Sequence, residues 1–237
     1  MLTGSQMQLS HSKIIADTAR ILSRFVDIIT LRTTIHHRML KLAQRVQIPV
    51  INVLTDDTHP CQILVDILTY EEHRGPIFSK IFAWMGKSNN VLHSLIEATA
   101  LFNFHLRIVI PKSSKPQTKH VEWSRKRGAH ITLTNDPQKA AENADCIITD
   151  TWVSMGQEFR VRNHSIFQPY QVNEALMKLA KPNALFMHCL PAHRGEEVVD
   201  TVIDGPHSVV FDEAENRFHT QKAIFAWCLH DAFFSTQ

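Results

Sequence analysis

The chain has 237 residues, of which 44% are hydrophobic and 20% are charged, with a formal net charge of +2 at pH 7. This composition is typical of a globular protein with a sizeable core. The near-neutral charge excludes a strong field for nucleic acid or an anionic membrane, so neither partner is expected. No apolar run reaches the roughly 18–20 residues that span a bilayer, and the basic stretch 112–126 is interpreted as a solvated surface.

In chain order, the first third alternates helical and extended patterns. Pro60 suits the first turn of a helix, and Gly75-Pro76 ends that helix. This turn is the expected boundary between a first domain, residues 1–75, and a second. The expected elements are helices at 14–25, 36–46 and 60–73, and strands at 27–32 and 49–53.

The second domain, expected over residues 76–212, continues the alternation, and a last helix at about 213–232 follows it. Helices alternating with buried strands predict a doubly wound α/β protein with parallel sheets, whose ligands bind at the carboxyl ends of the strands. The expected strands are 81–85, 105–110, 130–133, 145–149, 184–188 and 208–211, and the expected helices are 90–102, 118–127, 137–141 and 170–180.

Cysteine and histidine spacing gives no metal-binding pattern. Cys61, Cys146, Cys189 and Cys228 lie far apart without a CxxC pair, so we expect neither a structural zinc site nor a disulfide framework. Free thiols are typical of a reducing cytoplasm, and the N-terminal residues do not resemble a secretory leader. We therefore predict a cytoplasmic protein that needs no metal.

Four groups of polar residues follow predicted strands, where an α/β sheet places its ligand loops. Arg32 ends the first strand and offers donors for a phosphate or a carbonyl oxygen, although a surface salt bridge fits it equally well. His59 and Gln62 project from one face of a helix start and suit a developing negative charge. A helix cap with a solvated histidine is the alternative for that pair.

The other two groups are Asp150 to Gly156 and His188 to Arg194. A carboxylate at Asp150 suits an amine, and Met155 would line an apolar wall. Cys189 beside His188 suggests a thiolate nucleophile, but adjacent strand residues point to opposite faces, so a binding role is favoured. No GxxxxGK[ST] or GxGxxG phosphate loop is present, which argues against nucleotide-dependent chemistry.

Taken together, these motifs resemble the ornithine carbamoyltransferase family over nearly the whole chain. The most specific are Asp150-Thr151-Trp152-Val153-Ser154-Met155-Gly156, His188-Cys189-Leu190-Pro191 and Asp212-Glu213-Ala214-Glu215-Asn216-Arg217. The resemblance implies transfer of a carbamoyl group from carbamoyl phosphate to ornithine, giving citrulline and phosphate in arginine metabolism. It also implies no cofactor, a trimer or an assembly of trimers, and a final helix, residues 213–237, that returns to the first domain.

The resemblance assigns residues to each substrate. Asp150, Cys189, Arg32 and His59 would act in catalysis, the last two on the oxyanion and the first two on the amine. The carbamoyl-phosphate residues would be Gln8, Arg32, His59, Pro60, Cys61, Gln62, Cys189, Leu190 and Arg217. The ornithine residues would be Asn90, Asp150, Ser154 and Met155.

Two departures from the family leave alternatives open. The family's Ser-Thr-Arg-Thr-Arg phosphate segment is not found ahead of Gln8, so we expect a truncated first domain. Two explanations of this truncation are open. Either the sequence begins at an internal methionine of a longer carbamoyltransferase, or the chain is an inactive remnant that retains amino-acid binding or subunit association. Lys87-Ser88 replaces the usual Asp-Gly and keeps another amine, such as putrescine, open as the substrate.

Overall fold

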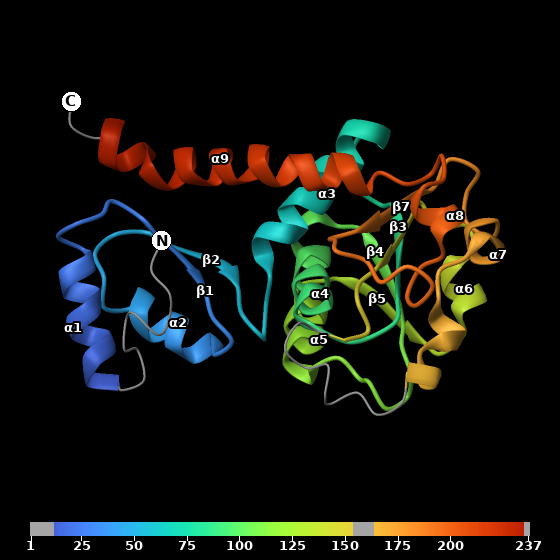
Figure 1. The fold of residues 1–237 in the computed structure, drawn as a ribbon, viewed down its shortest axis with the longest axis horizontal. Helices are drawn as coiled ribbons and strands as arrows, with labels where there is room; N and C mark the ends of the chain where they lie inside the picture. The colour runs from blue at the N-terminus through green and yellow to red at the C-terminus, as the bar shows by residue number, and fades with distance from the viewer. Residues whose placement is uncertain (1–11, 154–163, 235–237) are drawn as a thin grey trace.

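The structure is a computed structural model that describes residues 12–153 and 164–234. Two parallel sheets form its framework, one of two strands and one of five, with helices around both (Figure 1). The prediction of an α/β protein with parallel sheets is therefore confirmed. Within the described ranges, none of the helices combines the length and the apolar character needed to cross a bilayer.

The smaller sheet pairs β1 (Ile29–Arg32) with β2 (Val50–Leu54). Helices α1 (Ser12–Leu22) and α2 (His36–Ala43) accompany it. Ala19 of α1 and Leu42 of α2 are buried in a small cluster against the two strands. The carboxyl end of β1 brings Arg32 toward the larger sheet, and the loop after β2 leads directly to His59.

The larger sheet has the strand order β5-β4-β3-β6-β7, and all its pairs are parallel. Because the chain runs from β3 to one side and later returns to the other, the carboxyl ends of β3 and β6 form a topological switch point. The five strands are β3 (Ile81–Met85), β4 (His105–Val109), β5 (His130–Thr134), β6 (Cys146–Thr149) and β7 (Leu185–His188).

Alternate residues of these strands enter two separate cores. On β3, Phe82 and Trp84 face one core and Ala83 and Met85 face the other, as the two-residue period of a strand requires. The first core is covered by α3 (Pro60–Arg74), α4 (Asn90–Phe102) and α5 (Thr118–Arg125). The second is covered by α6 (Pro137–Ala141), α7 (Glu174–Met177) and α8 (Asp200–Ile203).

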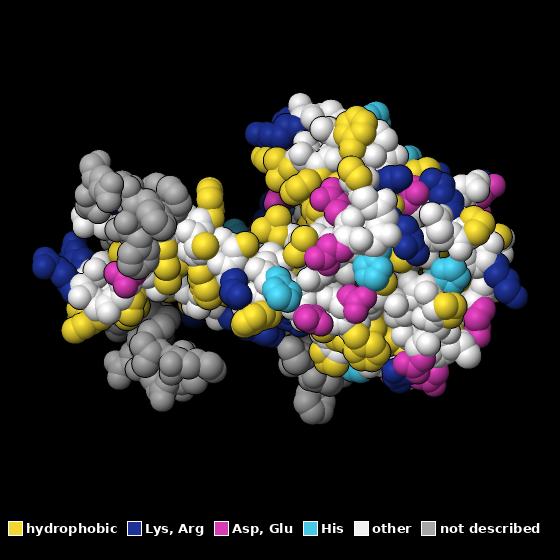
Figure 2. Space-filling model, turned by 90° about the horizontal axis from the view of Figure 1, so that it is seen from above, with side chains coloured by type: hydrophobic (Ala, Val, Ile, Leu, Met, Phe, Trp, Pro, Cys, Tyr) yellow, Lys and Arg dark blue, Asp and Glu magenta, His cyan; other side chains and the backbone are white. Residues whose placement is uncertain are grey.

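Helix α9 (Val210–Phe234) begins beside the larger sheet and runs along α3 toward the smaller one (Figure 1). Buried Asn216 of α9 donates to Thr69 Oγ1 at 3.0 Å and to Glu72 Oε2 at 2.6 Å, which fixes the register of the two helices. Figure 2 shows hydrophobic side chains on the face along which α9 runs. Phe211, Phe218 and Trp227 of this helix are 64%, 64% and 81% exposed.

Two predicted elements are wrong. The expected strand at 208–211 is limited to a single bridge between Ser208 and Phe186, and α9 starts at Val210. Of the helix expected at 170–180, only the short helix α7 forms, and it begins at Glu174 because the Asn173 side chain caps it there. Short 3-10 helices at His164–Ile166 and Gln168–Tyr170 precede it.

Candidate active site

One cavity of about 1170 Å³ lies between the two sheets. It is lined by the end of β1, by the loop after β2 and by the loops after β3, β6 and β7. The last three come from the switch point of the larger sheet, where α/β proteins place their ligands. Eight predicted site residues line this cavity: Arg32, His59, Gln62, Asn90, Asp150, Cys189, Leu190 and Arg217.

Asp150 follows β6 and is held by three donors. Asn89 Nδ2 donates to Oδ2 at 2.6 Å, and the Thr151 amide donates to Oδ1 at 2.8 Å. The third donor is the Cys189 thiol, with Sγ 3.3 Å from Oδ1. Asn89 also caps α4 by accepting from the Leu92 amide at 3.0 Å. One amide side chain therefore joins the start of α4 to the carboxylate, which is left facing the cavity.

Cys189 is a neutral donor in this arrangement. Burial, together with the charges of Asp150, Glu213 and Asp66, raises the pKa of its thiol well above the ordinary value. A thiolate nucleophile needs the opposite, a positive environment that lowers the pKa. A neutral thiol favours the predicted binding role over that of a nucleophile, and in this structure the thiol donates to Asp150.

His188 is turned away from the cavity and supports the loop that carries Cys189. Its ring is fully buried, with Nε2 3.1 Å from Glu197 Oε1, and Nδ1 accepts from the Leu190 amide at 2.9 Å. Leu190 has a φ of 49°, a left-handed conformation that costs a non-glycine residue free energy. The bond to His188 stabilises that conformation next to the site.

His59 lies at the start of α3, and only 7% of the residue is exposed. Burial and the positive charges of Arg217 and Arg32 lower the pKa of its ring to about 4, so the imidazole is neutral at pH 7. Its backbone amide donates to Ser94 Oγ at 2.8 Å. Among the described residues, none pairs with Nδ1, although this atom is buried. A neutral ring of this kind can donate one hydrogen bond to a ligand.

Arg32 and Arg217 bring positive charge to the same end of the cavity. Arg32 ends β1, and Arg217 reaches in from α9, where its Nη1 lies 3.4 Å from the Cys189 carbonyl oxygen. Arg32, Arg217 and His59 line the same cavity, and the two guanidinium charges help to lower the pKa of the His59 ring. Guanidinium groups suit phosphate oxygens, so this end is electrostatically matched to an anion.

Gln62 links this end to a pair of buried carboxyl groups. Its Nε2 donates to Asp66 Oδ1 at 2.8 Å and to Glu213 Oε1 at 2.9 Å. Burial raises the pKa of Asp66 to about 7 and raises that of Glu213 well above its ordinary value. Two carboxylates cannot both ionise in such a place, so they hold a proton between them at neutral pH. These two hydrogen bonds therefore fix the orientation of the Gln62 side-chain amide.

Residues 79–228 match the family described as aspartate/ornithine carbamoyltransferase, Asp/Orn binding domain, and residues 1–72 match its carbamoyl-P binding domain. The chain belongs to the aspartate/ornithine carbamoyltransferase family. An ornithine carbamoyltransferase of Brucella abortus is 67% identical, over 98% of this chain and 74% of the relative. One from Mesorhizobium japonicum is 62% identical, over 97% and 76%. The resemblance inferred from the motifs is thus confirmed.

Solved structures of family members share the fold. The ornithine carbamoyltransferase of Pyrococcus furiosus gives a TM-score of 0.89 at 46% identity, over 95% of this chain and 74% of that one. The anabolic ornithine carbamoyltransferase of Campylobacter jejuni gives 0.90 at 34% identity, over 97% and 78%. The described fold is therefore that of the carbamoyltransferase family.

Lys87 introduces a cation into the carbamoyltransferase cavity. Its ammonium group is half-buried after β3; burial lowers its pKa, and the charge of Asp150 acts in the opposite direction. Gly86 just before it has a φ of 116°, and a Cβ there would meet the Trp152 ring at 3.3 Å. The loop thus depends on glycine at this position and directs the two following residues, Lys87 and Ser88, to the cavity.

Other predicted site residues lie at the edge of the cavity or outside the described ranges. The Asn90 side chain lines the cavity but donates to the Thr55 carbonyl oxygen at 2.7 Å. Pro60 and Cys61 are not among the lining residues; Cys61 is buried, with Sγ 3.4 Å from the Asn52 carbonyl oxygen. Gln8, Ser154 and Met155 fall outside the residues that the structure describes. The sequence does not indicate Asn89, which the structure shows to be a partner of Asp150.

Three groups of residues in the described ranges have the ligand types of a metal site. They are Asp57 with His93 and His120, Asp150 with His188 and Cys189, and His193 with Glu196 and Glu197. In the second group, the Cys189 thiol is held protonated, whereas a metal ligand must be a thiolate. The His188 ring is already committed to Glu197 and Leu190. That group therefore fits the hydrogen-bonding role better than metal binding.

Proposed function

We propose that this chain transfers the carbamoyl group of carbamoyl phosphate to the side-chain amine of ornithine, giving citrulline and phosphate. The observation that carries the proposal is the polarity of the cavity. Arg32, Arg217 and His59 supply donors and positive charge, and Asp150 supplies a carboxylate, with Cys189 in contact with both Arg217 and Asp150. Family membership and the names of the relatives support the same reaction.

The two guanidinium groups and Gln62 would hold carbamoyl phosphate, with Gln8, Leu190 and Cys189 as further contacts. The neutral His59 ring would donate to the carbamoyl oxygen. As the amine attacks, that oxygen gains negative charge, and donors already in place stabilise it without reorganisation. The low pKa of His59 suits this role because the ring is not required to release a proton.

Asp150 and Cys189 would orient the side-chain amine of ornithine in its uncharged, nucleophilic form, with Asn90, Ser154 and Met155 beside the substrate. The uncharged side-chain amine then attacks the carbamoyl carbon and forms the C–N bond. Cleavage of the C–O bond releases phosphate with the electron pair, and the departing phosphate takes up the proton that the amine gives up. Catalysis of this kind depends mainly on positioning and electrostatics.

We further propose a homotrimer in the cytoplasm, acting in arginine metabolism. The exposed aromatic side chains of α9 form a surface of the kind that subunit association covers. The four cysteines are free, which fits a reducing compartment. Light scattering of the purified chain measures the assembly, and a monomeric mass at all concentrations would contradict it.

Lys87 keeps a second candidate open, a carbamoyltransferase that acts on a different amine such as putrescine. The purified chain is to be given carbamoyl phosphate with either ornithine or putrescine, and the products are to be quantified. We expect kcat/KM to be higher for ornithine, because the Asp150 to Gly156 motif is the one that resembles the ornithine carbamoyltransferases. A higher kcat/KM for putrescine would support the second candidate, and no product with either amine would support an inactive remnant.

A further inference from the structure

The loop between β2 and α3, residues 55–59, carries His59, and helix α5 holds this loop through the side chain of Asp57. The Asp57 side chain is only 12% exposed, and both of its oxygens lie 2.6 Å from Lys119 Nζ. His120 Nε2 lies 3.3 Å from Oδ1. Lys119 and His120 are neighbours on α5, so one turn of that helix holds the carboxylate of a loop that belongs to the smaller sheet.

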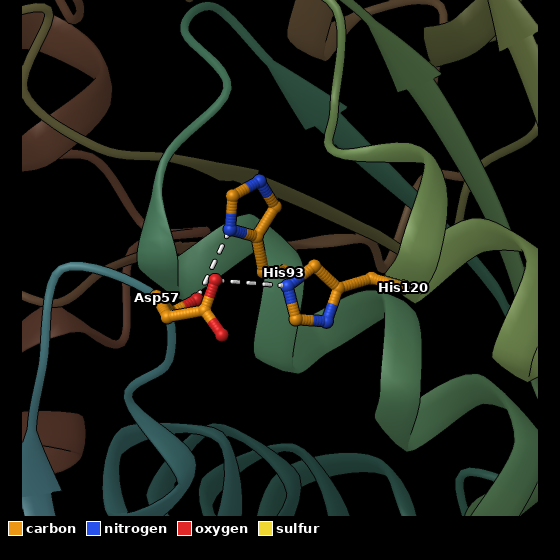
Figure 3. Close-up of side chains that lie close together, drawn as sticks. All are labelled: Asp57, His93 and His120. Atoms are coloured by element: carbon orange, nitrogen blue, oxygen red, sulfur yellow. Dashed lines mark hydrogen bonds and ion pairs between the residues drawn. The ribbon is translucent and has the colours of Figure 1, made fainter. Parts of the chain in front are cut away.

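His93 of α4 binds the same loop through its backbone. Its Nδ1 lies 3.0 Å from the Asp57 carbonyl oxygen, and its ring stacks on His120 with centroids 4.5 Å apart and planes 15° apart. Figure 3 shows the two rings on one side of Asp57. His120 Nδ1 lies 2.7 Å from Glu97 Oε1, so both of its ring nitrogens face carboxylates. Both the side chain and the backbone of Asp57 are therefore fixed.

This cluster does not fit a metal site, although its ligand atoms lie within 4.8 Å of one another. The lone pair of an imidazole nitrogen lies in the ring plane, so two nearly parallel stacked rings cannot both direct lone pairs at one ion. The ammonium group of Lys119 also lies against the carboxylate and would repel a cation. The arrangement is that of a hydrogen-bonded anchor.

Further bonds connect the anchor to His59. The His59 amide donates to Ser94 Oγ of α4 at 2.8 Å, and Asn90 at the start of α4 donates to the Thr55 carbonyl oxygen at 2.7 Å. Inside the loop, the Asp57 and Thr58 amides donate to Thr55 Oγ1 at 3.3 and 3.1 Å. The loop is thus fastened to α4 and α5 at Thr55, at Asp57 and at the His59 amide.

We propose that Asp57 is a positioning residue, which sets His59 against the carbamoyl group by anchoring residues 55–59 to α4 and α5. Asn89, which caps α4, also holds Asp150. Helix α4 therefore connects the carboxylate at the ornithine end to the loop at the phosphate end. This inference rests on the proposed carbamoyl transfer, because that reaction gives His59 its role.

The test compares Asp57→Asn, which keeps the size of the side chain, with Glu122→Gln, the same chemical change at an exposed position of α5. Citrulline kinetics and hydrogen exchange of residues 55–59 are to be measured on the full chain. We expect Asp57→Asn to lower kcat by about 10-fold or more, with KM for ornithine changed by less than about two-fold. Exchange in the loop should rise, and Glu122→Gln should match the wild type in both measurements.

An unchanged kcat in Asp57→Asn would overturn the proposal, and so would a loss of kcat without faster exchange in the loop. Lys119→Met, which changes a side chain that is 57% exposed, repeats the test if Asp57→Asn does not fold. If the wild type forms no citrulline, the proposed function fails. The exchange measurement then still decides whether the anchor holds the loop.

Discussion

At the scale of single residues, His59 couples the proposed catalysis to stability. Its pKa is about 4 in the folded chain, against an ordinary value of 6.5. Between these values the unfolded chain binds a proton that the folded chain does not. The contribution of His59 to folding is therefore fully present above pH 6.5 and is lost as pH falls toward 4.

We predict that His59→Gln, which cannot be protonated, flattens this dependence. Between about pH 7.5 and pH 4.5, the wild type should lose about 2 kcal/mol more unfolding free energy than the variant does. Denaturant titrations at the two pH values measure the difference. Equal losses in the two proteins would show that His59 is not held neutral by its surroundings.

Lys87 is the residue whose charge conflicts most directly with the ornithine end. Its ammonium group acts on Asp150, so a substrate α-ammonium group must bind in the presence of that charge. We predict that Lys87→Met lowers KM for ornithine by about five-fold, or about 1 kcal/mol, and leaves kcat within about two-fold. Steady-state kinetics with Lys112→Met, at an exposed position, as the control measure this split. A higher KM in Lys87→Met would show instead that Lys87 binds the substrate, for example at its carboxylate.

The sequence predicts those site residues that depend on strand position alone. Arg32, Asp150 and Cys189 follow strands of parallel sheets, so their convergence on one cavity could be expected. Asp57 and His120 carry no such signal, because 63 residues separate them and only the packed helices bring them together. The same holds for Gln62 and Glu213, which are 151 residues apart.

At the scale of elements, the contact between α3 and α9 contains the buried carboxyl groups of Asp66 and Glu213. The pKa of Asp66 is about 7 in the folded chain, against an ordinary value of 3.8. In that range the folded chain holds a proton that the unfolded chain has lost. The contribution to stability is therefore present below pH 3.8 and is lost as pH rises through 7, the opposite direction to that of His59.

Asp66→Asn removes one member of this pair while keeping its shape. We predict that the unfolding free energy of Asp66→Asn increases relative to that of the wild type as pH is raised from about 5 to 8. Chemical denaturation across this range measures the trend. Glu122→Gln, an exposed carboxylate, is the control and should show none. A constant difference between Asp66→Asn and the wild type would mean that the pair holds no shared proton.

Most elements of the larger sheet could be predicted, because buried strands and amphipathic helices have distinct periods. β3, α4 and α6 begin and end where expected. The run Ser208 to Phe211 is too short for the spacing of its apolar residues to distinguish a strand from the buried start of a helix. In the structure, helix α9 begins within this run, at Val210. At α7, the capping side chain of Asn173 sets the start, and the apolar spacing around it does not reveal this.

At the scale of the whole molecule, the cavity exists only because two sheets and α9 meet. Arg32 comes from the smaller sheet, Asp150 from the larger sheet and Arg217 from α9. Each substrate would therefore contact groups from different parts of the fold. The reaction therefore depends on the contacts that hold these parts together, such as those of Asn216 and Asp57.

Simultaneous measurement of citrulline and phosphate tests this account most directly, using the purified chain with carbamoyl phosphate and ornithine. Asp150→Asn, which keeps the shape of the side chain and removes its charge, serves as the comparison. We predict equal amounts of the two products from the wild type, and a kcat/KM for ornithine that is lower by about 100-fold in Asp150→Asn. Phosphate release without citrulline, or equal rates in the two proteins, would contradict the account.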